Sequence, residues 1–234
     1  MSLRAREVLP ELMDSPTLAP AHLEVALRGL ERINWWSRSA GILWNPIQRL
    51  AREASPRPLR VLDLATGGGD VPIALWRKAR RAGIALRIDG CDVNPRAVAY
   101  ATRRAEAHGA DVRFFVLNAL EEPLPPGYDA SVCALFFHHL RDEIACRVLA
   151  RMAEAAGRMI GINDLLRSRR GLALASGGGV LLSRSAVVHA DAPQSVRAAF
   201  TIEEIARLAI EAGLRDFQLR RRWPCRYFFE WTRP

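Results

Sequence analysis

The chain has 234 residues, of which 50% are hydrophobic, and a formal net charge of +9. This length suits one α/β domain with a substantial core and is too short for two large domains. No apolar stretch reaches 18 residues, so we expect no membrane span. Met1 is followed by a charged segment with several prolines and not by an apolar run with a cleavage site, so we expect no signal peptide. The four cysteines form no C-x-x-C pair, which argues against a zinc site and a disulfide framework and indicates a reducing, cytoplasmic setting.

The positive charge is spread over many arginines. Lys78 is the only lysine, and arginine clusters occur at 77–81, 103–104, 167–170 and 220–222. This bias is typical of a GC-rich genome, and most of the clusters fall on predicted helix surfaces or hairpins. We therefore expect solvated faces and no nucleic-acid partner, with RNA binding kept as an alternative.

Residues 1–58 are expected to form an N-terminal helical cap. Prolines 10 and 20 indicate a loose arm, and helices are predicted over 21–33 and 46–54. Trp35, Trp36 and Trp44 are three of the six tryptophans of the chain. They either pack within this helical layer or form an aromatic lid over a small-molecule pocket, and we favour the lid.

From residue 59 the pattern alternates between apolar strands and amphipathic helices. The expected strands are 59–64, 85–92, 112–117, 130–137 and 158–163, and the expected helices are 70–81, 94–108 and 142–156. This alternation predicts an α/β fold with a doubly wound, mostly parallel sheet. Two further strands within 217–232 predict a C-terminal antiparallel hairpin, which brings the sheet to seven strands.

The alternation is interrupted over residues 164–198, before a capping box at Thr201-Ile-Glu-Glu204 starts another helix. Connections of this length in a compact domain usually form lids or binding elements. We therefore assign residues 59–234 to one catalytic core that carries an acceptor-lid insertion at about 164–198.

A glycine-rich turn, Asp63-Leu-Ala-Thr-Gly-Gly-Gly69, joins the first strand to the next helix. Glycine lets the backbone turn sharply and approach a ligand, and such turns bind nucleotides at the carboxyl edge of a parallel sheet. Pro72 stands where a dinucleotide fingerprint needs its third glycine, and no Gly-Lys-Ser/Thr follows, which excludes a P-loop.

The turn resembles the D-x-G-x-G-x-G motif of class I S-adenosylmethionine-dependent methyltransferases, with Ala65 at the first glycine position. The resemblance covers roughly residues 25–232 and implies a Rossmann-like sheet, S-adenosyl-L-methionine as cofactor and S-adenosyl-L-homocysteine as product. By this resemblance Asp92 holds the ribose hydroxyls. The residues implied in cofactor binding are Asp63, Ala65, Thr66, Gly67, Gly69, Asp92, Val93, Asn118, Ala119, Ala134 and Leu135. Asn118 and Ala119 are expected to face adenine, and Ala134 and Leu135 the methionine part.

Different stretches of the chain resemble two kinds of methyltransferase. Arg32-Ile-Asn34 and the glycine turn resemble quinone-ring C-methyltransferases, whose motif reads V-A-T-G-T-G-D. The stretch Phe136–Asp142 and the later Phe-Thr-Ile-Glu-Glu resemble enzymes that tailor polyketides and phenols. The resulting interpretation is a methyltransferase, monomeric or homodimeric, of a small aromatic acceptor with O-methylation favoured. C-methylation of a quinone-type ring and RNA methylation are the alternatives.

Three histidines are candidate catalytic residues. A base with a pKa near neutrality would help to deprotonate a phenol, and histidine suits this role. His138 and His139 follow the fourth strand, and His189 lies in the insertion two residues before Asp191. Each also has a structural interpretation, and catalysis by proximity alone, without an essential base, remains open. Asn163 and Asp164 could contact acceptor hydroxyls, and no metal site is expected.

Overall fold

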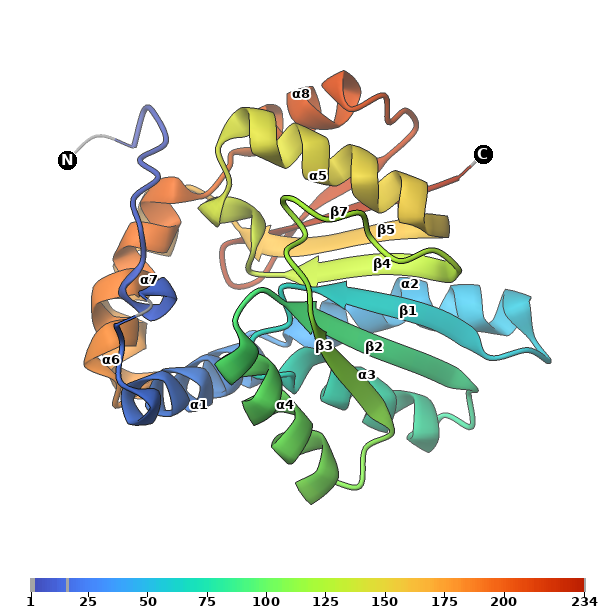
Figure 1. The fold of residues 1–234 in the computed structure, drawn as a ribbon. Helices are drawn as coiled ribbons and strands as arrows, with labels where there is room; N and C mark the ends of the chain where they lie inside the picture. Colours follow the sequence, from blue (N-terminus) through green and yellow to red (C-terminus); the bar gives the residue numbers. More distant parts are fainter. Residues whose placement is uncertain (1–2, 16, 234) are drawn as a thin grey trace.

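The strands assemble into a single sheet whose order places the ends of the parallel strands side by side. The computed structural model describes residues 3–15 and 17–233, with the backbone alone for 178–181. The sheet order is β3-β2-β1-β4-β5-β7-β6 (Figure 1). Its strands are β1 (Leu59–Leu64), β2 (Leu86–Asp92), β3 (Val112–Val116), β4 (Tyr128–Ala134), β5 (Ala156–Leu165), β6 (Gln218–Arg222) and β7 (Arg226–Thr232). The first five strands are parallel, and β7 runs antiparallel between β5 and β6. The predicted sheet and C-terminal hairpin are confirmed.

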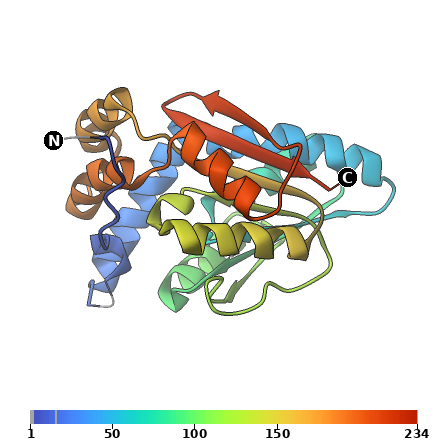
Figure 2. The ribbon, with the colours of Figure 1, turned by 90° about the horizontal axis from the view of Figure 1, so that it is seen from above.

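Helices cover both faces of the sheet and one of its edges. The helices are α1 (Pro20–Trp36), α2 (Ser39–Ala54), α3 (Asp70–Arg81), α4 (Pro95–Ala107), α5 (Asp142–Ala155), α6 (Arg169–Leu182), α7 (Ala186–Ala198) and α8 (Ile202–Glu211), with 3-10 turns η1 (Leu12–Asp14) and η2 (Phe137–His139). Helices α5 and α8 lie on one face, and α2, α3 and α4 lie on the other (Figures 1 and 2). Helices α1, α6 and α7 gather with the N-terminal arm beyond the carboxyl ends of the strands (Figure 1).

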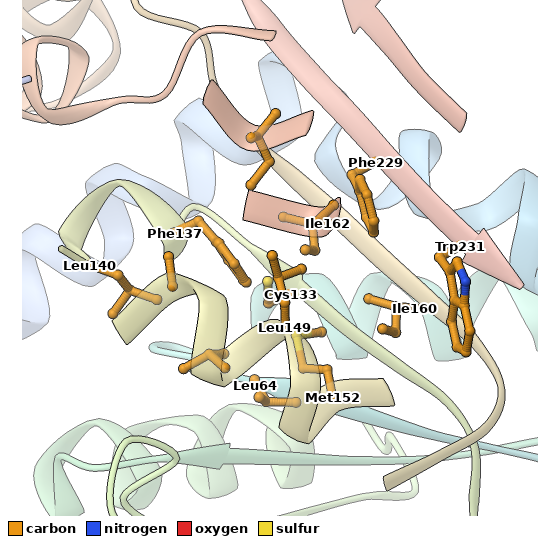
Figure 3. Close-up of a cluster of buried hydrophobic side chains, with 14 of the residues drawn as sticks. Leu64, Cys133, Phe137, Leu140, Leu149, Met152, Ile160, Ile162, Phe229 and Trp231 are labelled. Atoms are coloured by element: carbon orange, nitrogen blue, oxygen red, sulfur yellow. The ribbon is translucent and has the colours of Figure 1, made fainter. Parts of the chain in front are cut away.

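Strand side chains point alternately to the two faces of the sheet, so an apolar layer forms on each face. Leu62 and Leu64 face α5, whereas Leu59 and Val61 face α2 and α3, because successive side chains of a strand point to opposite faces. Figure 3 shows Leu149 and Met152 of α5 in the first layer, near the strand residues Cys133, Ile160 and Ile162.

Three expectations about element boundaries were wrong. Helix α2 begins at Ser39 and contains Pro46, because burial of Leu43 and Ile47 along one helix face outweighs the hydrogen bond that proline removes. Helix α1 continues to Trp36. Strand β4 ends at Ala134, because Leu135 adopts a left-handed conformation with φ 56° and directs the chain into η2.

The segment 164–198 is mostly helical. Strand β5 extends through Leu165, and α6 and α7 then pack against each other and against α1. Glycines 177–179 suggested an irregular connection, but tertiary packing overrides a local propensity of this kind. Across the described residues, no helix combines the length and apolar character that a membrane span requires.

Replacing Leu149 by alanine should destabilise the fold. Its side chain is fully buried between α5 and the sheet, so the substitution leaves a cavity and should lower the free energy of unfolding by about 2–5 kcal/mol. Arg147→Ala, on the exposed side of the same helix, is the control and should change it by less than about 0.5 kcal/mol. Urea denaturation of both variants measures the difference. Equal effects would contradict the assigned packing of α5.

Candidate active site

The chain leaves β1 through a turn with three left-handed residues. Ala65, Gly67 and Gly69 have φ angles of 51°, 53° and 73°. A Cβ on Gly69 would lie 2.7 Å from the ring of Phe114, so this position requires glycine for space as well as for conformation. Ala65 holds its left-handed conformation without that freedom and is therefore strained.

Two buried polar atoms beside the turn lack a well-formed hydrogen bond within the described part of the chain. They are the Asp63 Oδ1 and Thr66 Oγ1 atoms, and the interaction of Thr66 with Asp63 lowers the pKa of Asp63 only in part. Burial raises the pKa of Asp63 to about 8, so its carboxyl group is mostly neutral at pH 7. Unpaired buried polar atoms are costly, and a polar ligand at the turn would satisfy them.

Asp92 ends β2 directly beside the glycine turn. Its Oδ2 accepts a hydrogen bond from the Gly67 N–H at 2.8 Å, and its Oδ1 accepts one from the Asn94 N–H at 2.9 Å. A carboxylate has about four lone-pair positions, so two backbone donors leave capacity for ribose hydroxyls. Burial raises the pKa of Asp92, and the two backbone hydrogen bonds oppose this shift. Val93, the next residue, is exposed.

The other residues implied in cofactor binding follow the neighbouring strands at the same edge. Asn118 and Ala119 come just after β3, and the Asn118 Oδ1 accepts a hydrogen bond from the Leu120 N–H at 3.1 Å. Ala134 ends β4, and the Leu135 N–H donates to the Asn163 carbonyl oxygen at 3.0 Å. The turn, the orphan polar atoms and Asp92 together fit S-adenosylmethionine, and the individual binding roles remain predictions.

An apolar cavity of about 470 Å³ lies at the carboxyl edge, next to the end of β4. Its lining comes from the N-terminal arm, α1, α6, α7 and the strand ends. It includes Met13, Leu30, Ile33, Trp36, Leu135, His138, His139, Leu165, Leu174, Val188, Val196 and Arg226. The volume is in the range of small-molecule sites, and the apolar lining suits an aromatic acceptor.

Only one of the three N-terminal tryptophans borders this cavity. Trp36 lines it and packs against Trp223 with ring centroids 4.5 Å apart. Trp35 is 81% exposed, and Trp44 packs against the core layer on the α2 side. The aromatic lid expected from the sequence is therefore limited to Trp36.

His138 forms a buried pair with Asp164. Its Nδ1 lies 2.7 Å from Asp164 Oδ1, and Asp164 Oδ2 accepts hydrogen bonds from the backbone N–H groups of Phe136 and His138. Burial alone would raise the pKa of Asp164, but the charge and hydrogen bond of His138 hold it below its ordinary value. With Nδ1–H donating to this carboxylate, Nε2 is the nitrogen available to accept a proton.

The N-terminal arm supplies a further carboxylate, Glu11, to the two histidines. Glu11 Oε1 lies 3.7 Å from His138 Nε2, and Glu11 Oε2 lies 3.9 Å from His139 Nε2. Burial would lower the pKa of His139, but the hydrogen bond and charge of Asp14, together with Glu11, raise it to about 9. Ligand atoms of Glu11, His138 and His139 lie within 4.8 Å of one another, close enough to hold a metal ion.

His189 does not pair with Asp191, contrary to the arrangement considered from the sequence. It lies on α7, where its Nε2 is 2.7 Å from the Ser183 carbonyl oxygen, and it is outside the cavity lining. The Asp191 carboxylate instead accepts hydrogen bonds from the Leu12 and Met13 N–H groups. Residues i and i+2 of a helix point in different directions, which explains the separation. A catalytic role for His189 stays a prediction without geometric support.

Sequence reasoning missed Glu11 and Arg226 as cavity residues. Glu11 reaches the site because Asp191 and Gln194 of α7 hold the arm, with the Gln194 amide donating to the Leu9 and Pro10 carbonyl oxygens. No local pattern near Glu11 signals this contact. Arg226 could have been suspected, because a charged residue that opens an apolar strand is unusual.

Replacing Asp92 by alanine should abolish cofactor binding. The substitution removes the carboxylate expected to hold the ribose and also frees the Gly67 N–H. Calorimetric titration with S-adenosylhomocysteine should give at least a 100-fold loss of affinity. Asp89→Ala is the control on the same strand, since Asp89 pairs with Arg113 and Tyr128, and it should bind normally. Wild-type affinity in Asp92→Ala would overturn the site.

Replacing Ala65 by glycine should stabilise the protein. Glycine removes the Cβ clash at φ 51° and should raise the free energy of unfolding by up to about 1 kcal/mol. Ala99→Gly, at an exposed position within α4, should lower it by about 0.5–1 kcal/mol. Chemical denaturation measures both, and a loss of stability in Ala65→Gly would contradict the assigned strain.

Comparison with known proteins agrees with the methyltransferase-like fold. Residues 61–157 match the family described as methyltransferase domain. A demethylmenaquinone methyltransferase of Thermus thermophilus is 42% identical over 113 residues, which cover 47% of this chain and 49% of the relative. A second, from Deinococcus radiodurans, is 37% identical over 86 residues, which cover 36% of this chain and 34% of the relative. The matched segments thus span about half or less of these curated relatives.

Solved structures share the fold along nearly the whole chain. A SAM-dependent methyltransferase of Aquifex aeolicus has a TM-score of 0.61 at 18% identity and covers 92% of this chain and 99% of its own. Magnesium protoporphyrin IX methyltransferase of Synechocystis, solved with bound SAH, has a TM-score of 0.57 at 16% identity and covers 95% of this chain and 91% of its own. Residues 61–157 therefore match a methyltransferase domain, and nearly the whole chain has the fold of S-adenosylmethionine-dependent methyltransferases.

Proposed function

We propose that the protein methylates a hydroxylated aromatic ring of the quinone type, at a ring carbon. The observation that carries the proposal is His138, which pairs with the buried Asp164 and lines an apolar cavity that also borders Leu135. Leu135 directly follows β4, the strand that pairs with β1, so the cavity lies at the same edge of the sheet as the glycine turn. The acceptor and the cofactor would then meet at the ends of β1 and β4.

The cofactor would be held at the ends of β1, β2 and β3. Asp92 would accept hydrogen bonds from ribose hydroxyls, and the glycine turn would make room for the methionine end. S-adenosylmethionine supplies an electrophilic methyl group on an already activated leaving group. The protein therefore contributes mainly alignment of the acceptor and control of its proton.

His138 would act as the general base. Its Nε2 would take the proton of a ring hydroxyl, and the Asp164 carboxylate would stabilise the imidazolium that forms. Removal of this proton gives a phenolate, whose negative charge is shared between the oxygen and the ortho and para ring carbons. Either atom is then nucleophilic, so the orientation of the ring in the cavity decides between C- and O-methylation. Attack by a ring carbon breaks the bond between the sulfonium and the methyl group and releases S-adenosylhomocysteine. The methylated carbon then loses its proton, and the ring oxygen regains one, which restores the aromatic ring.

The preference for the ring carbon comes from the relatives. The sequence placed O-methylation of a phenol first and C-methylation of a quinone-type ring second. The two curated relatives are both demethylmenaquinone methyltransferases, which favours the second. Most of the residues that line the cavity are apolar, which supports a fused or substituted hydrocarbon ring as acceptor.

We further infer that residues 1–58 and 164–198 act together as the cover of the acceptor. Helices α6 and α7 pack against α1, and η1 packs against α7, so the two segments form a single wall over the strand ends (Figure 1). This contact supports the division into a helical cap, a catalytic core and a lid insertion that the sequence predicted.

A transfer assay with tritiated S-adenosylmethionine tests the function. The acceptors are 1,4-naphthoquinol, 1-naphthol and tRNA, and NMR locates the new methyl group. We expect methyl on a ring carbon of the quinol. His138→Gln and Asp164→Asn should lower the rate by about 10²–10⁴-fold with S-adenosylhomocysteine affinity unchanged. His22→Gln, at an exposed position, is the control.

Other results would change the assignment. A methyl ether as the sole product would restore O-methylation, and labelled tRNA alone would overturn a small-molecule acceptor. An undiminished rate in His138→Gln would remove the base and leave catalysis by proximity. Loss of activity with EDTA, restored by a divalent metal ion, would assign Glu11, His138 and His139 to a metal site.

A further inference from the structure

Arg226 is a buried cation in the wall of the acceptor cavity. It opens β7 opposite Leu165 of β5, at the carboxyl edge of the parallel strands. The residue is only 2% exposed, yet it lines the cavity with His138. A charged residue in this position borders an otherwise mostly apolar space.

The protein partners of Arg226 are neutral. Its Nη1 donates to Ser39 Oγ, and its Nη2 lies 3.5 Å from Asn34 Oδ1. Within the described part of the chain, no carboxylate oxygen lies within 4.0 Å of its guanidinium nitrogens. Burial lowers the pKa of Arg226 to about 10, so the group stays charged at neutral pH.

Two other arginines with buried side chains each form a direct ion pair, which Arg226 lacks among the described residues. Arg167 forms an ion pair with Glu204 at 2.6 Å, and Arg6 forms one with Asp142 at 2.7 Å. A buried charge is normally paired, because removing it from water is costly. Arg226 has neutral hydrogen-bond partners, and the charges of Asp164 and Asp70 act on it without a direct ion pair. Because Arg226 lines the cavity, an anion bound there would supply the direct ion pair that the other two arginines have.

A second polar group lies under the same face of the sheet. Asn163 is fully buried, and neither its Oδ1 nor its Nδ2 has a hydrogen-bond partner among the described residues. Asn163 pairs with Phe228 and Leu165 with Arg226, so Asn163 and Arg226 are diagonal neighbours on one face. The polar groups at this end of β5 and β7 are therefore not satisfied by the protein alone.

We propose that Arg226 binds an oxyanion of the acceptor, such as a carboxylate or a second ring oxygen, opposite the hydroxyl that faces His138. The inference rests on the proposed function, since it places the acceptor in this cavity. The planar guanidinium group suits bidentate recognition of such an anion. Arg226 would thus select acceptors that carry a second oxygen function and fix the orientation of the ring.

The methionine carboxylate of the cofactor has the same chemistry and is the other possible source of the anion. Asn34 links the two regions, because it contacts Arg226 and also hydrogen-bonds Asp70 at the start of α3. The cavity lining includes Arg226 but none of the residues Asp63 to Gly69. We therefore assign the anion to the acceptor, and binding measurements separate the two sources.

The test measures binding in the absence of turnover. Wild-type protein saturated with S-adenosylhomocysteine is titrated with 1-hydroxy-2-naphthoate and with 1-naphthol, which differ by one carboxylate. We expect at least a tenfold preference for 1-hydroxy-2-naphthoate. Arg226→Met should remove this preference, change the affinity for 1-naphthol less than twofold, and leave S-adenosylhomocysteine affinity unchanged. Arg226→Lys keeps the charge but loses the planar group with two parallel N–H donors. This variant should retain part of the preference for 1-hydroxy-2-naphthoate.

Each contrary result leads to a specific conclusion about Arg226. Equal wild-type affinities for the two probes would overturn the proposal without any variant, so misfolding of Arg226→Met cannot obscure the test. A preference that survives in folded Arg226→Met would also overturn it. A loss of S-adenosylhomocysteine affinity in that variant would reassign the anion to the cofactor. Because no methyl transfer is measured, a failed transfer assay leaves this result interpretable.

Discussion

The buried carboxylate of Asp164 organises the acceptor half of the site. It accepts hydrogen bonds from the backbone N–H groups of Phe136, His138 and Leu165 and from the His138 ring. One side chain at the end of β5 therefore fixes the turn η2 after β4 and also the orientation of the imidazole. A carboxylate with this many donors remains ionised inside the protein, which burial alone would prevent. The proposed base, His138, and its carboxylate partner are then held by a strand end and a short turn.

The remaining parts of the site are arranged around this pair by sheet topology. Parallel strands β1, β2, β4 and β5 end at the same edge, so a turn after one strand lies beside the turn after its neighbour. The glycine turn and Asp92 form one half of this edge, and His138, Asp164 and Arg226 form the other. Leu135, between them, uses a left-handed backbone conformation to turn the chain away from the sheet. Strain at this position is consistent with a site that holds two ligands close together.

Much of the fold followed from local sequence patterns, because strand alternation and helix periodicity are properties of neighbouring residues. Asp63 and the glycine turn could be proposed as a cofactor site for the same reason, since the motif is short and continuous. Asp92 could be proposed because it ends the next strand of the alternating pattern. Glu11 was not found, because its position depends on hydrogen bonds between the arm and Asp191 on α7. The pairing of His138 with Asp164 was also invisible, although both residues were noted, because 26 positions separate them. The false pairing of His189 with Asp191 came from assuming a loop where the chain forms α7.

The insertion of α6 and α7 between β5 and α8 has an evolutionary consequence. These helices contribute to the acceptor cavity but not to the sheet, and the family match, residues 61–157, ends before them. Substitutions there alter the shape of the cavity while the ends of β1, β2 and β3 stay as they are. Under the proposed function, sequence changes in this helical pair would alter the fit of the acceptor together with the arm, α1 and Arg226. The strand ends proposed to hold the methyl donor would not need to change with them.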